Sequence, residues 1–112
     1  MARILLVDDD TEGLELRRTI LEHHGHRIET ASTPAAARAI FSSFVPECVI
    51  ADLHLPDAAA GRALLVEFRQ STPLIRIIVL SGHPAEAEQA ADLVLLKPLR
   101  SEQLIAAITP AF

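Results

Sequence analysis

Short apolar runs, separated by stretches of helical periodicity, constrain the fold of this 112-residue chain more than any other feature of its sequence. Strands of a parallel sheet that is covered on both faces are fully buried, so they are almost continuously hydrophobic. Four runs have this character and about the length of a strand, namely residues 4–7, 48–51, 77–80 and 93–96. A fifth run, residues 26–31, alternates polar and apolar side chains and is typical of an edge strand.

Between these runs the apolar residues recur every three or four positions, as on one face of an amphipathic helix. Three stripes have this spacing: Ala36, Ala37, Ile40, Phe41 and Phe44; Gly61, Leu64, Leu65 and Phe68; and Leu104, Ile105 and Ile108. Asp10 and Thr33 are predicted N-caps, Pro34 a first helical residue and Gly25 a helix end. Strand and helix therefore alternate, which predicts an α/β fold with a three-layer, doubly wound, five-stranded parallel sheet.

The composition predicts one globular domain over residues 1–112 and excludes several classes of function. No apolar run approaches the roughly 18 residues of a membrane span, so we expect no membrane partner. The formal charge of −5 and the 4% aromatic content disfavour direct binding of nucleic acid, which requires a basic face. The one cysteine, Cys48, excludes an internal disulfide, favours a cytoplasmic location and is expected to pack in the core.

Acidic side chains follow two of the expected strands. Asp8 and Asp9 come after residues 4–7, and Asp52 comes after residues 48–51. Because the carboxyl ends of neighbouring strands meet at one edge of a doubly wound sheet, the three carboxylates should share one cleft. Like charges this close repel each other and require a counter-ion. Carboxylate oxygens suit a hard divalent cation, Mg²⁺ or Mn²⁺.

Ser81 and Lys97 follow the runs at 77–80 and 93–96, so they should reach the same edge. Lys97 is the only lysine in the sequence. The edge would then carry a carboxylate nucleophile, ligands for a metal, a hydroxyl that bonds a phosphoryl oxygen and an ammonium that offsets phosphoryl charge. This set of groups favours the formation of an aspartyl phosphate.

Four motifs, taken in order, resemble the receiver domain of two-component response regulators over nearly the whole chain. They are residues 6–9 (LVDD), 46–56 (PECVIADLHLP), 80–82 (LSG) and 97–98 (KP). The resemblance implies a single receiver domain with the flavodoxin-like strand order 2-1-3-4-5. It also implies a cis peptide bond before Pro98.

Carried over residue by residue, the resemblance assigns roles to the acidic edge. Asp52 would be the phosphoacceptor, and Ser81 and Lys97 would contact the phosphoryl group. The metal ligands would be Asp8, Asp9, Asp52 and the backbone carbonyl of His54, with Asp8 acting mainly through a metal-bound water.

The resemblance implies a phosphorylation switch and no separate substrate. A sensor histidine kinase or a phosphotransfer protein would supply the phosphoryl group, and the chain would catalyse only its own phosphorylation and dephosphorylation. The modified chain would then bind a downstream effector, which is unknown. One alternative is a receiver-like interaction module that works without phosphate. Another is a haloacid-dehalogenase-like phosphatase: Asp8 and Asp10 form its Asp-x-Asp pair, but Glu12 replaces its usual Thr or Val, and Asp52 has no role in it.

Several positions depart from the receiver pattern. Val94 stands where the family usually has an aromatic residue, and Gly61 comes one residue late, which predicts an insertion within 56–61. The interval from Ser81 to Lys97 is shorter than usual and predicts a shortened fourth helix.

Histidines allow two interpretations each. His54 and His83 either tune the lifetime of the phosphoryl group or are solvated loop residues. His23, His24 and His26 either bind a metal or compensate a helix dipole, and their place at the end of a helix favours the dipole.

Overall fold

The computed structural model describes residues 2–52, 57–82, 91–98 and 100–108 of the chain. Within them, five parallel strands form one sheet in the order β2-β1-β3-β4-β5. The strands are β1 (Arg3–Val7), β2 (Arg27–Ala31), β3 (Cys48–Asp52), β4 (Arg76–Ser81) and β5 (Leu93–Leu96). The five predicted strands and their order are confirmed, and β2 lies at an edge, as its alternating pattern predicts.

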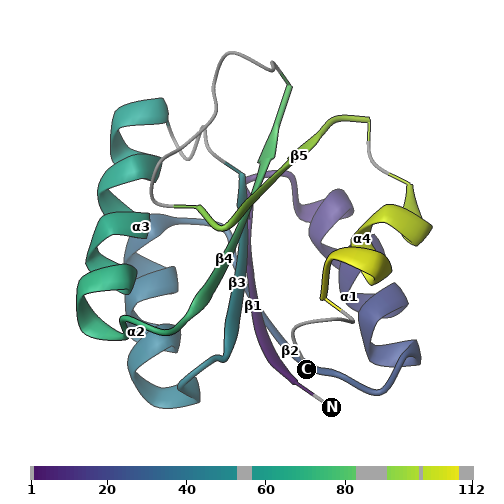
Figure 1. The fold of residues 1–112 in the computed structure, drawn as a ribbon, viewed down its shortest axis with the longest axis horizontal. Helices are drawn as coiled ribbons and strands as arrows, with labels where there is room; N and C mark the ends of the chain where they lie inside the picture. The colour runs from purple at the N-terminus through teal and green to yellow at the C-terminus, as the bar shows by residue number, and fades with distance from the viewer. Residues whose placement is uncertain (1, 53–56, 83–90, 99, 109–112) are drawn as a thin grey trace.

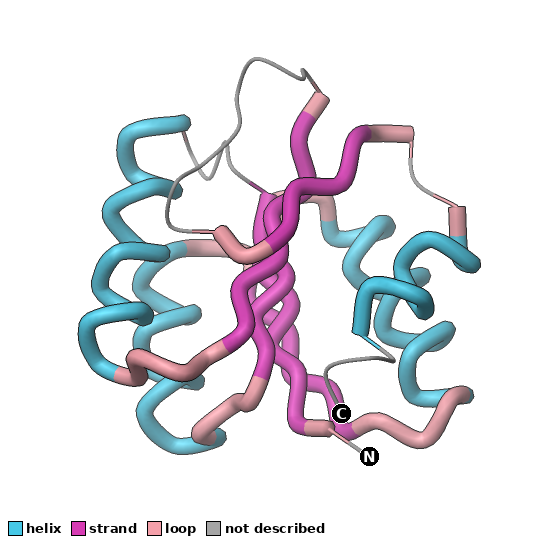
Figure 2. Tube along the Cα trace, viewed as in Figure 1, coloured by secondary structure: helices cyan, strands magenta, loops and turns pink. Residues whose placement is uncertain are grey.

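The described helices cover both faces of this sheet. They are α1 (Thr11–His23), α2 (Pro34–Phe44), α3 (Ala58–Ser71) and α4 (Ser101–Ile108). Helices α2 and α3 cover one face, and α1 and α4 cover the other (Figure 1). Figure 2 shows the strands as the central layer of three, as predicted. The shortened helix expected before β5 lies almost wholly outside the described residues. Of the interval 56–61, within which an insertion is expected, only residue 56 lies outside them.

Side-chain caps start three of the helices. Asp10, Thr33 and Asp57 each accept a hydrogen bond from the backbone N–H three residues further on, at 3.2, 3.1 and 2.9 Å. Each bond satisfies an N–H that has no partner inside the helix. At the end of α1, Gly25 adopts a φ of 89°, a left-handed conformation that glycine takes without a steric penalty. The predicted caps at Asp10 and Thr33 and the predicted stop at Gly25 are confirmed.

Successive residues of the central strands enter two different cores. In β3, Val49 and Ala51 pack with α2 and α3, whereas Cys48 and Ile50 pack with α1 and α4. Cys48 is fully buried, and burial raises the pKa of its thiol to about 12. The thiol is therefore protonated at neutral pH and packs as a small apolar group, as predicted.

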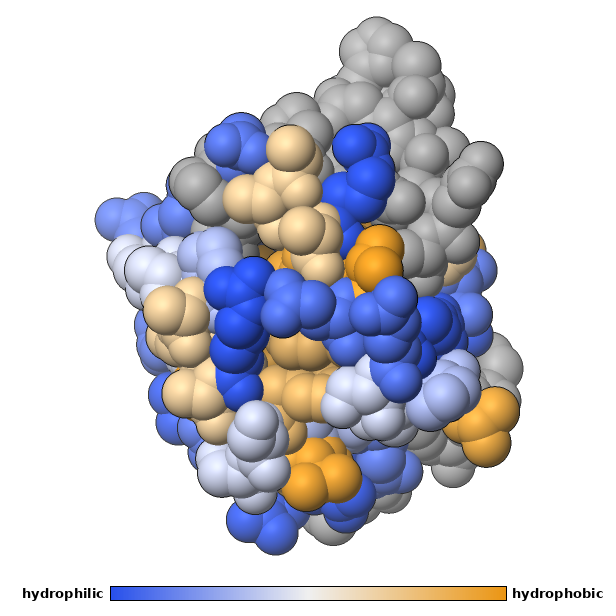
Figure 3. Space-filling view, turned by 90° about the vertical axis from the view of Figure 1, so that its left-hand side faces the viewer, coloured by the Kyte–Doolittle hydropathy of each residue, from blue (hydrophilic) through white to orange (hydrophobic). Residues whose placement is uncertain are grey.

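An aromatic pair joins α2 to α3. The rings of Phe41 and Phe68 stack with centroids 4.1 Å apart and planes 4° from parallel. Toward the solvent, Arg38 and Glu67 form an ion pair at 2.6 Å. Hydrophobic residues remain visible between hydrophilic ones on the side of the molecule that carries α2 and α3 (Figure 3). The stack continues the core between the two helices.

We expect Phe68→Ala to lower the free energy of unfolding by about 3 to 5 kcal/mol, because it leaves a cavity and removes the ring stack. Phe68 is 3% exposed, whereas Val66 on the same helix is 40% exposed. Val66→Ala is therefore the matched control, with an expected cost of about 0.5 kcal/mol or less. Urea unfolding measures both values. A cost below about 1 kcal/mol for Phe68→Ala would contradict this account of the core.

A second connection ties the loop after α3 to the start of β5. Asp92 Oδ2 accepts hydrogen bonds from the Ile77 backbone N–H at 2.7 Å and from the Arg69 guanidinium at 2.8 Å. Arg69 also donates to the carbonyls of Pro73 and Ile75, at 3.1 and 2.6 Å. Burial raises the pKa of Asp92, but the Ile77 N–H and Arg69 more than offset it, so this pKa lies below its usual value.

Asp92→Asn should lower stability near neutral pH, because the charged carboxylate is the form that Arg69 and the Ile77 N–H favour. The pKa of Asp92 is lower in the folded than in the unfolded chain. Its contribution is therefore complete above the unfolded value of about 3.9 and is lost as the pH falls through the folded value.

Urea unfolding of both proteins at pH 7 and at pH 3 measures this effect, and the difference in stability should shrink at pH 3. Glu67→Gln breaks an exposed ion pair and serves as a control with a small effect at either pH. A difference between wild type and Asp92→Asn that does not change with pH would disprove the role of the Asp92 charge.

Candidate functional site

Four adjacent strands end at one edge of the sheet and bring the expected site residues together. Val7 of β1 pairs with Ala51 of β3, so the residues that follow them, Asp8 and Asp52, lie side by side. Asp52 pairs with Leu80 of β4, which precedes Ser81. Ser81 in turn pairs with Leu96 of β5, which precedes Lys97. The strand register therefore places Asp8, Asp52, Ser81 and Lys97 in a row across the edge.

The acidic cluster consists of Asp8, Asp9 and Asp52. One carboxylate oxygen from each lies within 4.8 Å of the other two. Asp8 is 2% exposed and Asp52 is 9% exposed, whereas Asp9 is open to solvent. Three convergent oxygen ligands with one open side fit a hard cation such as Mg²⁺, which keeps several of its waters. Within the described residues, no other group of acidic, histidine or cysteine side chains is arranged in this way.

The histidines near the end of α1 are engaged in local contacts instead. His24 Nδ1 lies 2.9 Å from the carbonyl of Ile20, and His26 Nδ1 accepts a hydrogen bond from the Ala2 N–H at 3.1 Å. His23 lies in the last turn of α1, at the negative end of the helix dipole. His23 and His24 therefore lie where the dipole interpretation expects them. His26 does not fit it, because burial lowers the pKa of its ring and its Nδ1 accepts from Ala2.

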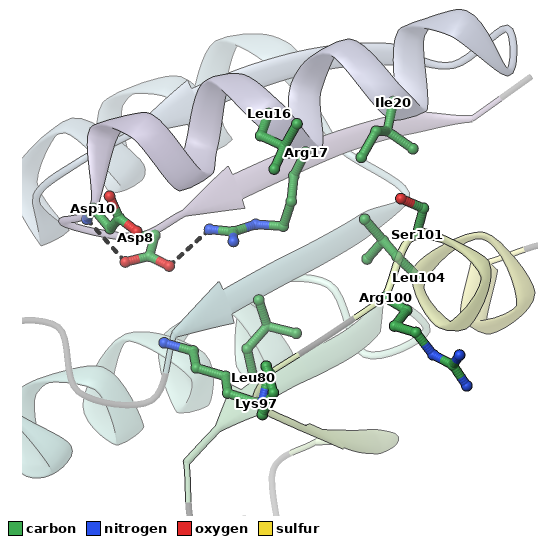
Figure 4. Close-up of a pocket in the computed structure, with 11 residues that line it drawn as sticks. Asp8, Asp10, Leu16, Arg17, Ile20, Leu80, Lys97, Arg100, Ser101 and Leu104 are labelled. Carbon is green, nitrogen blue, oxygen red and sulfur yellow. Dashed lines mark hydrogen bonds and ion pairs between the residues drawn. The ribbon is translucent and has the colours of Figure 1, made fainter.

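Two cations contact the acidic cluster. Lys97 Nζ donates to Asp52 Oδ2 at 2.9 Å, and Arg17 Nη2 donates to Asp8 Oδ2 at 2.7 Å. The other oxygen of Asp8, Oδ1, accepts from the Asp10 backbone N–H at 3.0 Å. Figure 4 shows Arg17 reaching from α1 toward Asp8. Lys97, which follows β5, points toward the same region.

Lys97 is predicted from the sequence motifs, whereas Arg17 is not. A signal for it does exist, because Arg17 lies three residues after Leu14 and four before Leu21, the two buried residues of α1. A cation on the inward side of the helix that follows an aspartate cluster can reach that cluster. The ion pair therefore follows from helical spacing, once the helix is docked on the sheet.

The pKa of Asp8 is raised above its usual value. Burial is the largest cause, and the negative charge of Asp52 adds to it. The backbone N–H of Asp10 and the charges of Arg17 and Lys97 act in the opposite direction. Repulsion between the carboxylates is expected from the sequence, and the structure shows that desolvation contributes more to the raised pKa of Asp8.

A cavity of about 220 Å³ adjoins the acidic cluster. Asp8, Arg17 and Lys97 line its charged part, and apolar side chains of α1 and α4 line the rest, among them Leu16, Ile20 and Leu104. The labelled side chains in Figure 4 surround this space from the two helices and the strand ends.

The remaining site residues lie near the end of β5. Ser81 is fully buried, and its carbonyl accepts from the Lys97 backbone N–H at 2.8 Å. The peptide bond between Lys97 and Pro98 is cis, as predicted.

Val94 is half-buried and packs against the core beneath α2 and α3. His54 and His83 lie outside the described residues.

Sequence comparisons identify relatives of the chain. A family model of the response regulator receiver domain matches residues 4–109. The chain is 33% identical over 108 residues to the alginate biosynthesis transcriptional regulatory protein AlgB of Pseudomonas aeruginosa. It is 30% identical over 110 residues to the response regulator MprA of Mycolicibacterium vanbaalenii. These alignments cover 91% and 93% of this chain but only 24% and 47% of the relatives, so it spans about a quarter to a half of their length.

Solved structures give the same result. A CheY-like response regulator receiver domain protein from Methanospirillum hungatei has a TM-score of 0.89 and 29% identity, over 99% of this chain and 93% of that one. The response regulator TrrA from Thermotoga maritima, in complex with Mg²⁺ and BeF, has a TM-score of 0.88 and 28% identity over the whole of both chains. No helix in the described residues has the length and apolar character needed to cross a membrane. The family match, the fold and the row of strand-end residues agree: this chain belongs to the response regulator receiver domain family.

Proposed function

We propose that this receiver, taken as one domain over residues 1–112, accepts a phosphoryl group on Asp52. The observation that carries the proposal is the contact of Lys97 Nζ with Asp52 Oδ2 at 2.9 Å, inside a cluster of three carboxylates. Only Asp52 in this cluster combines a central strand end with a direct bond to the site's lysine. The donor is the phosphohistidine of a sensor histidine kinase or of a phosphotransfer protein.

Asp52 acts as the nucleophile in this transfer. A carboxylate oxygen forms a bond to phosphorus as the bond between phosphorus and the donor's histidine nitrogen breaks, and that nitrogen keeps the electron pair and takes up a proton. Lys97 then pairs with the phosphoryl oxygens, and the Ser81 hydroxyl donates to one of them. The chain catalyses this reaction and the later hydrolysis on itself, and its modified form binds a downstream effector.

In the same proposal, Asp9 and Asp52 would bind a divalent cation directly, Asp8 would act mainly through a metal-bound water, and the His54 carbonyl would be a further ligand. Mg²⁺ or Mn²⁺ supplies positive charge next to the phosphoryl oxygens when it is bound. The three carboxylates lie close enough together for this, with oxygens within 4.8 Å of one another. The complex of the Thermotoga maritima receiver with Mg²⁺ and BeF supports the assignment.

The position of Asp10 argues against the phosphatase alternative. That mechanism needs Asp10 as the second member of an Asp-x-Asp pair, but its Oδ1 accepts from the Gly13 N–H and caps α1. The caps at Asp10 and Asp57 serve the helices, whereas Asp8, Asp9 and Asp52 face one another. Five of the six aspartates of the chain therefore divide between structural caps and the proposed metal site, and the sixth, Asp92, bonds Arg69 and the Ile77 N–H.

Incubation with acetyl phosphate and Mg²⁺ should add one phosphoryl group, and intact-mass spectrometry detects it. The adduct should be lost in Asp52→Asn and in the presence of a chelator. Asp10→Asn is the matched control, because asparagine caps a helix as well as aspartate does, and it should keep the adduct. An adduct that survives in Asp52→Asn would refute the assignment, and no adduct in the wild type would favour the module that works without phosphate.

Lys97→Met should slow phosphorylation by about 100-fold, because it removes the ammonium that stabilises the charge of the transferred group. It should not weaken the binding of Mg²⁺, because the lysine competes with the metal for Asp52. Calorimetric titration with Mg²⁺ and the rate of adduct formation measure the two effects separately. Arg100→Met removes an exposed charge from the cavity rim and is the control. Equal losses of metal binding and phosphorylation in Lys97→Met would contradict this division of roles.

A further inference from the structure

Arg17 approaches the acidic cluster from α1 and pairs with Asp8, the most buried carboxylate of the three. Its Nη2 donates to Asp8 Oδ2 at 2.7 Å, and its side chain is only 17% exposed. Because the Asp10 N–H engages Asp8 Oδ1, both oxygens of this carboxylate have hydrogen-bond donors. A cation that binds at Asp8 must therefore displace the guanidinium or share the carboxylate with it.

The next residue in the sequence behaves differently. Arg18 pairs with Glu15 and Glu22 along the outer surface of α1, at 3.5 and 3.3 Å, and its side chain is 43% exposed. The two arginines carry the same charge on the same helix turn, but only Arg17 reaches the strand edge. The position of Arg17, and not the charge of α1 as a whole, brings positive charge to the cluster.

We propose that Arg17 is a resident counter-ion that competes with the divalent cation for Asp8 and so sets the metal affinity of this receiver. The inference rests on the metal site of the proposed function. In the metal-free protein, three carboxylates face two cations, Arg17 and Lys97, which leaves one negative charge uncompensated. A divalent cation then enters a site that is already largely neutralised, and it is repelled by the guanidinium at short range with little solvent between them.

The cavity of about 220 Å³ gives the displaced guanidinium a place to move to. Arg17 lines this cavity, and so do Ser101 and Leu104 of α4. Rotation of the long side chain away from Asp8 keeps its methylene groups against the apolar wall and leaves the charged end near solvent. Arg17 therefore has two positions available, one on Asp8 and one in the cavity.

The roles of the two cations are distinct. Lys97 contacts Asp52, the proposed phosphoacceptor, whereas Arg17 contacts Asp8. Removal of Arg17 should thus change how much Mg²⁺ the protein needs, while Asp52 and Lys97 remain in place. Arg17 therefore affects phosphorylation only indirectly, through Asp8 and the binding of the metal.

Calorimetric titration with Mg²⁺ tests the proposal directly. Arg17→Met should bind Mg²⁺ at least about tenfold more tightly than the wild type, because the competing charge is gone. Arg18→Met, the matched control, changes the net charge equally and should bind Mg²⁺ as the wild type does. Arg17→Lys, which keeps the charge, should restore most of the wild-type affinity. Equal affinities for Arg17→Met and Arg18→Met would overturn the proposal.

Arg17→Met can lower the stability of the folded protein, because it leaves a buried carboxylate without its cation. A second measurement, the Tm with and without Mg²⁺, therefore tests the proposal independently of this loss. Saturating Mg²⁺ should raise the Tm of Arg17→Met more than that of Arg18→Met, since tighter binding to the folded state gives more stabilisation. Arg17→Gln, which keeps a hydrogen-bond donor for Asp8 but no charge, should respond in the same way. If neither Arg17→Met nor Arg17→Gln folds even in saturating Mg²⁺, the proposal is wrong, because the metal should replace the missing counter-ion.

Failure of the proposed function gives a different result. If the wild type and every variant bind no Mg²⁺, the metal site itself is refuted. If the wild type binds Mg²⁺ and Arg17→Met binds it no more tightly, only the role of Arg17 is refuted.

Discussion

The burial of neighbouring carboxylates at one edge of the sheet is the constraint on which this structure depends. Asp8 and Asp52 are nearly inaccessible to water, and Asp9 lies beside them. Carboxylates with little water around them are costly unless cations or N–H donors face them. Lys97, Arg17 and the Asp10 N–H meet this requirement, and each comes from a different part of the chain.

The parallel sheet brings the carboxylates together and also brings one of the cations that neutralise them. Parallel strands place all of their carboxyl ends at one edge, so residues after β1 and β3 must converge there. The same geometry delivers Lys97 after β5. Helices on both faces exclude water from Asp8, Asp52 and Ser81, which strengthens the charge interactions of the two buried carboxylates. Charged residues that are distant in sequence therefore interact directly at this edge of the sheet.

The site combines residues that belong to the receiver motifs with one residue, Arg17, that does not. Asp8, Asp9, Asp52, Ser81 and Lys97 match the family motifs, and the family match covers residues 4–109. Arg17 is not part of those motifs, yet it forms the shortest contact described for the cluster, at 2.7 Å. In the proposal for Arg17, such a neighbour changes metal affinity without any change of ligands, because a charge at short range shifts binding.

The sequence by itself determined the strands, the helix caps at Asp10 and Thr33, and the convergence of the aspartates with Lys97. The strands and caps follow from the pattern of neighbouring residues in the sequence. The convergence of the aspartates with Lys97 follows from the geometry that all parallel sheets share. Only the tertiary structure decided that Arg17 pairs with Asp8, that Asp92 holds Arg69, and that burial outweighs repulsion at Asp8. These outcomes depend on how closely helices dock on the sheet and how much water they exclude. Neither quantity is a property of any single segment of the sequence.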